Sequence, residues 1–110
     1  MISTEIRERY LRDPLQIRLG GLAADLARVA SCANEPKDRD AVTRLLEESK
    51  HFAEWAALDA PLDVQATLAD VQLWAARRQR WWLTGKAQPD LQEQAQRWAD
   101  RLLELSGLAC

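Results

Sequence analysis

Apolar side chains recur at alternating steps of three and four residues along much of the chain. In the segment 14–33 this line comprises Leu15, Leu19, Leu22, Leu26, Val29 and Ala33. In the segment 89–106 it comprises Leu91, Ala95, Trp98, Leu102 and Leu105. Residues three and four apart share one face of an α-helix, so each line predicts an amphipathic helix with an apolar side facing a core.

The two middle segments carry similar lines. In the segment 36–57 the buried side is expected to hold Val42, Leu45, Leu46, Ser49, Phe52, Ala53 and Ala56. In the segment 64–84 it is expected to hold Val64, Leu68, Val71, Ala75 and Trp82. No segment shows the strict alternation of apolar and polar residues that indicates a half-buried strand.

Turn-forming and capping residues separate these segments. Asp13-Pro14 is expected to open one helix as N-cap and first residue, and Asp63 to cap another. Gly85 and Gly107 are expected to end the last two helices. Because the connections are short, neighbouring helices should be antiparallel. The sequence therefore predicts one all-α domain, an antiparallel up-and-down four-helix bundle, with helices over about 14–33, 36–57, 64–84 and 89–106 and a short N-terminal helical arm over 1–12.

Two further features concern contacts outside the predicted core. Ile2, Ile6 and Tyr10 recur every fourth residue in the arm, which either docks on the bundle or extends to bind a partner. The back of the first long helix carries small residues where a surface helix normally carries charge, and its members are Ile17, Gly20, Gly21, Ala24 and Ala27. Either the arm or a second copy of the chain packs closely there, or the helix bends at the glycine pair. We favour a contact.

The helix predicted over 36–57 has a second outward feature. The helical count places Trp55 and His51 on the face opposite the core. A tryptophan that faces water is a common anchor of protein interfaces. We therefore treat these two residues, with the small-residue face, as candidate interface positions.

Three of the five tryptophans lie in one basic stretch of the predicted third helix. The candidate anion- or partner-binding residues of this stretch are Trp74, Arg77, Arg78, Arg80, Trp81, Trp82 and Lys86. Arg78 lies three or four residues from each tryptophan, so all three indoles should reach its guanidinium. Arg77 and Arg80 should point toward water.

Arg78 has two interpretations. In the structural one, its stem lies on the indoles and its charge meets an acidic residue at the same end of the bundle, where Asp38, Asp40, Asp90 and Glu93 are available. In the other, Arg78 and the indoles bind an anion or a partner. A buried charge without a counterion is costly, which favours the structural interpretation.

Charge and composition limit the function classes. Fifteen basic residues oppose 17 acidic ones, for a net charge of −2, which argues against a dedicated nucleic-acid binder. No apolar run is long enough for a transmembrane helix, and MISTEIRERYLRD lacks the apolar core of a signal peptide, so we expect a cytoplasmic protein. Cys32 and Cys110 should lie at opposite ends of the bundle, too far apart for a disulfide.

Catalytic and metal-binding patterns are weak. Glu48 and His51 match the Glu-x-x-His spacing of di-iron bundles, but those sites need two such motifs and this chain has one histidine. Gly20-Gly21 lies inside a predicted helix and lacks a phosphate-loop pattern. We expect no enzyme activity, no metal and no cofactor.

Two segments carry a resemblance to known proteins. LLEESKHFAEW, over 45–55, and LADVQLWAARRQRWW, over 68–82, resemble small uncharacterised all-helical proteins of cyanobacteria, across about a third of the chain. The resemblance implies a cytoplasmic helical bundle and brings no activity with it. The sequence as a whole favours a non-enzymatic protein–protein interaction or scaffold module that self-associates as a homodimer or binds another protein. The alternative is an anion-, nucleotide- or nucleic-acid-binding protein that uses the Trp/Arg-rich stretch.

Overall fold

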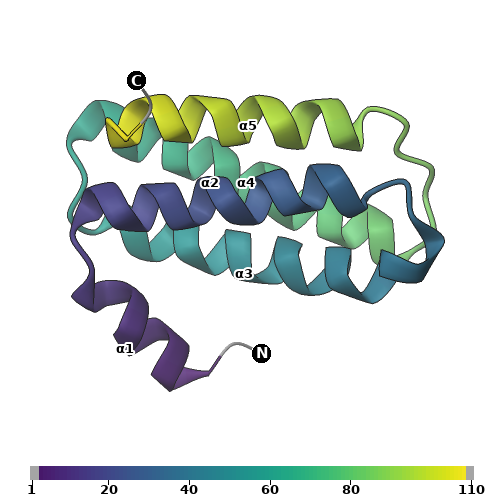
Figure 1. Cartoon of the computed structure of the whole chain (residues 1–110), viewed down its shortest axis with the longest axis horizontal. Helices are drawn as coiled ribbons and strands as arrows, with labels where there is room; N and C mark the ends of the chain where they lie inside the picture. Colours follow the sequence, from purple (N-terminus) through teal and green to yellow (C-terminus); the bar gives the residue numbers. More distant parts are fainter. Residues whose placement is uncertain (1–2, 109–110) are drawn as a thin grey trace.

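The computed structural model describes residues 3–108, and this part of the chain is helical throughout apart from short connections (Figure 1). Its elements are α1 (Thr4–Arg12), α2 (Leu15–Cys32), a 3-10 turn (Pro36–Asp38), α3 (Arg39–Ala57), α4 (Leu62–Leu83) and α5 (Leu91–Ser106). The described residues contain no strand. The all-helical prediction is therefore confirmed.

The four long helices lie side by side, and consecutive ones run alternately from one end of the molecule to the other (Figure 1). α2 packs against both α5 and α3, and α4 packs against α3. The backbones of α4 and α5 make few close contacts, and hydrogen bonds from the side chains of Trp74 and Arg78 to Gln94 link the two helices. The shorter α1 lies at an angle beside α3.

The core is built from the apolar lines that the spacing predicts. Each long helix contributes side chains with no measurable exposure, and examples are Leu22, Leu26, Leu46, Leu68 and Leu102. These side chains exclude water from the centre of the helix cluster and supply its main stabilisation. Ser49 is also fully buried, as its place in the line over 36–57 predicts.

The helix starts differ from the sequence prediction, whereas two helix ends agree with it. α2 begins after Pro14 and α4 begins at Leu62, and neither start has a capping side chain, so Asp13 and Asp63 were wrongly assigned as N-caps. Asp63 lies instead in the first turn of α4, where its charge faces the positive end of the helix dipole. Gly85 and Gly107 follow α4 and α5 with φ values of 77° and 74°, a left-handed conformation that suits glycine.

Cys32 is a free, half-buried thiol. The expectation for Cys110 concerns a residue outside 3–108, as does the part of the arm pattern that rests on Ile2. Within 3–108, none of the helices combines the length and the apolar character that a bilayer-crossing segment requires.

Candidate functional site

α1 covers the face of α3 that the sequence assigned to solvent. The Tyr10 ring stacks on Phe52 at a centroid distance of 3.9 Å, and the Tyr10 hydroxyl donates a hydrogen bond of 2.7 Å to the carbonyl of Arg18. Trp55 lies under the same helix and is only 7% exposed, with the Arg7 guanidinium 5.8 Å from its ring. The prediction that Trp55 faces water is wrong, because the helix-face count cannot detect a covering helix from elsewhere in the chain.

His51 is also engaged within the chain. Its Nε2 atom lies 2.9 Å from a carboxylate oxygen of Glu47, and its ring lies 5.5 Å from the Trp55 ring. Partial burial opposes ionisation of Glu47, but hydrogen bonds from Gln79, Lys50 and His51 lower the pKa of Glu47 to about 2. His51 therefore belongs to a polar network between α3 and α4, and its ring is half-buried rather than outward.

The small-residue face of α2 is partly covered from within the chain. The Tyr10 ring lies 3.9 Å from where a Cβ atom on Gly21 would lie, and the Leu108 side chain would approach a Cβ on Gly20 to 2.8 Å. The Leu108 contact accounts for Gly20, whereas 3.9 Å is an ordinary van der Waals distance that leaves room for a Cβ atom at Gly21. Ile17 and Ala24 stay exposed, and Ala27 is half-buried.

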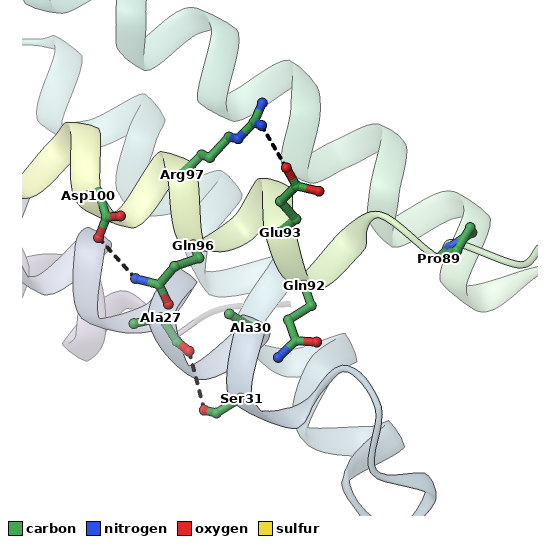
Figure 2. Close-up of a pocket in the computed structure, with 9 residues that line it drawn as sticks. All are labelled: Ala27, Ala30, Ser31, Pro89, Gln92, Glu93, Gln96, Arg97 and Asp100. Carbon is green, nitrogen blue, oxygen red and sulfur yellow. Dashed lines mark hydrogen bonds and ion pairs between the residues drawn. The ribbon is translucent and has the colours of Figure 1, made fainter.

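Ala27 borders an open groove of about 540 Å³ between α2 and α5 (Figure 2). Figure 2 shows the side chains of Gln92 and Gln96 extending from α5 toward α2, while Glu93 and Arg97, which also line the groove, pair with each other. Gln96 donates to Asp100 at 3.0 Å, and Asn34 donates to Gln92 at 2.6 Å. Because these polar groups satisfy one another, the groove shows no arrangement built for a ligand.

Arg78 forms the most connected polar cluster of the described residues. Only 7% of the residue is exposed, and its guanidinium donates two hydrogen bonds to the Asp90 carboxylate, at 2.8 Å and 3.0 Å. It also donates to the side-chain oxygens of Gln94, at 2.7 Å, and Gln88, at 3.3 Å. The hydrogen bonds from Arg78 hold the pKa of Asp90 below its usual range.

The indoles beside this cluster are divided between two arginines. Trp74 and Trp81 lie with their ring centroids 5.8 Å and 5.2 Å from the Arg78 guanidinium carbon. Trp82 turns toward α3, with its ring 4.8 Å from the guanidinium of Arg39 and its Nε1 donating to the Arg39 carbonyl at 3.1 Å. The prediction that all three indoles reach Arg78 is therefore wrong for Trp82.

These contacts favour the structural interpretation of Arg78. The charge is neutralised by Asp90, and the guanidinium ties α4 to α5 where their backbones make few contacts. The exposed cations of the stretch are Arg77, Arg80 and Lys86, and none of them forms an ion pair within residues 3–108. The Lys86 ammonium lies 4.0 Å from the centroid of the Trp81 ring.

A buried carboxyl group of α2, Asp25, lies near the half-buried Glu48 of α3 and was not predicted from the sequence. Asp25 is 3% exposed, and its Oδ2 atom has no hydrogen-bond partner. Burial raises the pKa of Asp25 to about 8, with further increases from the side-chain hydrogen bond and the negative charge of Glu48. The sequence spacing could have indicated its burial. Asp25 lies three residues after Leu22 and four before Val29, so it falls on the core side of its helix.

The side of α4 that faces away from the core carries a second apolar line. Its positions repeat at steps of four and three over the whole helix, and all of them except Arg80 are apolar. We call them the outer α4 face: Leu62, Ala66, Ala69, Leu73, Ala76, Arg80 and Leu83. The three leucines are 82%, 58% and 65% exposed. Sequence reasoning missed this face because it assigned α4 one apolar line, the one that points inward. The heptad-like spacing that could have identified it is visible in the sequence.

The chain was compared with models of protein families, with curated proteins and with solved structures, and none of the three comparisons gives a match. The resemblance to cyanobacterial helical proteins therefore stays an expectation.

Proposed function

We propose that this chain is a non-enzymatic protein–protein interaction module that self-associates through the outer α4 face. The observation that carries the proposal is the exposure of Leu62, Leu73 and Leu83 along one line of a helix. Exposed apolar residues are common singly, but an extended line of them usually marks a contact surface. Heptad-like spacing fits a second helix as the partner, since facing helices interlock side chains at this repeat.

The finer architecture that we propose is the antiparallel up-and-down four-helix bundle. Alternating helix directions and the pairings of α2 with α3, α3 with α4 and α2 with α5 support this arrangement. α4 and α5 would complete the ring through the Arg78 cluster rather than through close backbone packing. In this arrangement the outer α4 face is left without a partner helix in the chain.

A glutamate at position 73 should abolish self-association. Leu73 lies at the middle of the outer α4 face and is 58% exposed, so Leu73→Glu should leave the fold intact while placing a charge at the centre of the contact. The measurement is absolute mass by light scattering over a wide concentration range with reductant present. We expect the unaltered chain to approach the mass of a dimer as concentration rises and Leu73→Glu to remain monomeric.

The matched control is Leu103→Glu, which places the same charge on an exposed leucine of α5. This variant should associate like the unaltered chain. A dimer that survives Leu73→Glu would show that another surface is responsible, and circular dichroism of both variants would verify that helicity is retained.

A second candidate function rests on the unpaired cations of the Trp/Arg-rich stretch. Arg77, Arg80 and Lys86 are exposed beside Trp81, so a phosphate could meet positive charge and a base could stack on the indole. Titration with a single-stranded oligonucleotide at low salt should then give a saturable change in tryptophan fluorescence. The affinity should fall steeply with added salt and fall again in an Arg77→Gln/Lys86→Gln variant. Unchanged fluorescence at low salt would remove this candidate.

A further inference from the structure

We infer that the outer α4 face binds the same face of a second copy in antiparallel orientation, about a two-fold axis that passes close to Leu73. The inference rests on the proposed function and adds the identity of the partner, the direction of the paired helices and the contacts that set this direction.

The outer α4 face reads almost the same in both directions. Leu62 and Leu83 lie at nearly equal distances on either side of Leu73, roughly 16 Å and 15 Å at about 1.5 Å per residue. Antiparallel pairing therefore sets each terminal leucine opposite the other terminal leucine of the second copy, with the two Leu73 side chains at the axis. A two-fold interface requires such self-complementarity, because every contact occurs twice.

Small residues separate these leucines. Ala69 and Ala76 come between the centre of the face and its ends, and each would face the other across the axis. Ala76 also lies in an open hollow of about 540 Å³ whose other lining residues are Leu73, Arg77, Arg80 and Trp81. A small residue between larger ones leaves room for a side chain of the facing helix, as helix packing of ridges into grooves requires.

The charges on and beside the outer α4 face have opposite signs at its two ends. Asp63 and Asp70 lie in the first half of the helix, and Arg77 and Arg80 lie in the second half. All four are exposed, and none forms an ion pair within the described residues. Antiparallel pairing brings the acidic half of each copy against the basic half of the other.

One of these pairings is specific. Asp70 precedes Leu73 by three residues and Arg77 follows it by four, so the two lie on the same flank at similar distances from the axis. Asp70 of each copy would therefore lie opposite the second copy's Arg77, giving two equivalent ion pairs. In a parallel pairing, residues with the same sign of charge would lie at the same level along the two helices.

The other flank offers no opposing charge. Gln65, Gln72 and Gln79 lie there, and Gln65 and Gln79 hydrogen bond to α3 groups of their own chain. A single pair of helices about 33 Å long is a small contact compared with permanent interfaces. We therefore expect a dimer that depends on concentration rather than a permanent one.

Charge reversal tests the pairing of Asp70 with Arg77. Asp70→Arg alone and Arg77→Asp alone should each weaken self-association about tenfold, because each replaces two ion pairs with two repulsions. Asp70→Arg/Arg77→Asp should restore it. An equimolar mixture of the two single variants should form a heterodimer, since one copy is then basic and the other acidic at both positions. Arg9→Asp, an equal change of charge on α1, should have no effect.

Cysteine cross-linking tests the direction of the helices. The background is Cys32→Ser/Cys110→Ser, and the two variants made in it are Ala69→Cys and Ala76→Cys. Antiparallel packing predicts that a mixture of the two forms a mixed disulfide under mild oxidation, whereas each alone does not. In this packing, the two copies of either position would be roughly 10 Å apart along the direction of the helices. A disulfide needs Cα atoms within about 7 Å of each other, so identical positions cannot form one.

The outcomes separate this inference from the proposed function. If Leu73→Glu prevents dimer formation but the single cysteine variants cross-link with themselves, the outer α4 face self-associates in parallel and the antiparallel inference is wrong. If the dimer depends on Leu73 but single charge reversals leave its affinity unchanged, the inferred ion pairs between Asp70 and Arg77 do not form. A chain that stays monomeric at every concentration overturns both the inference and the proposed self-association.

Discussion

Replacing Arg78 with alanine should lower the free energy of unfolding by about 3 kcal/mol. The change removes two charge-assisted hydrogen bonds to Asp90 and one to Gln94, and it leaves Trp74 and Trp81 without the guanidinium that lies beside them. The loss stays below that of a fully buried pair, because the side chain of Asp90 is 48% exposed and can return to water.

Urea unfolding at neutral pH, followed by circular dichroism, measures this effect. Arg44→Ala is the matched control, since it removes the same side chain from an exposed position of α3 and should change stability by less than about 0.5 kcal/mol. Equal stabilities of the two variants would mean that the contacts of Arg78 stabilise the folded protein no more than hydration of its guanidinium would. The cluster would then lose its structural interpretation, and an anion-binding role for Arg78 would gain support.

Replacing Asp25 with asparagine should make the protein several kcal/mol more stable at pH 8 and should flatten the dependence of stability on pH. Burial first, then the hydrogen bond and charge of Glu48, raise the pKa of Asp25 to about 8, whereas the unfolded chain ionises near pH 3.9. Between about pH 4 and pH 8 the folded protein holds a proton that the unfolded chain has lost. The stability contributed by neutral Asp25 is therefore complete at low pH and is lost as the pH rises to about 8, by up to about 1.4 kcal/mol per pH unit.

The groups around Asp25 set this behaviour. Glu48 of α3 raises the pKa of Asp25. Arg28 of α2 lies 3.8 Å from the Asp25 carboxylate, and its positive charge opposes this increase. The negative charge of Asp25 in turn raises the pKa of Tyr10 in α1. Asparagine keeps the size of the side chain and cannot ionise, so Asp25→Asn should equal the unaltered chain near pH 4 and exceed it at pH 8. The comparison is made by urea unfolding at pH 4, 6 and 8, with the exposed Asp100→Asn as control. Parallel stability curves for Asp25→Asn and the unaltered chain would mean that Asp25 ionises normally.

The all-helical fold was predictable because core burial repeats with the period of the helix. The lines through Leu22, Leu46 and Leu102 needed no knowledge of how the helices meet. The helix starts were harder, since Asp13 and Asp63 have the right side chains for capping but do not occupy the capping position. Small differences in backbone direction decide such positions, and the sequence does not report them.

The candidate sites depended more strongly on tertiary contacts. The helical count correctly places Trp55 on the outer side of α3. Trp55 is nevertheless buried, because α1 covers it and the Tyr10 ring lies beside its indole. Trp82 packs against Arg39 of α3 and not against Arg78, which lies four residues before it in the same helix. In both cases the position of the tryptophan on its own helix was predicted correctly. The sequence did not indicate which other helix would pack against it.

The outer α4 face shows a different limit. Leu62, Leu73 and Leu83 have readable spacing, but the same helix also carries the inward line of Leu68 and Val71. With apolar residues on two sides, a helix lacks the single polar face by which burial is normally assigned. The sequence could indicate both lines, and only the packing of α4 on α3 shows which one is free.

The extensive packing of α2 on α5 also constrains how the chain acquires its structure during synthesis. α2 leaves the ribosome early, whereas α5 follows roughly 60 residues later, which at about 5–20 residues per second is a delay of several seconds. During that interval the α5-facing side of α2 has no native partner and is open to chaperones or to nascent chains on neighbouring ribosomes. Completion of the native core must therefore wait until α5 has been synthesised, and the rate of translation between α2 and α5 sets how long this side of α2 is vulnerable to aggregation.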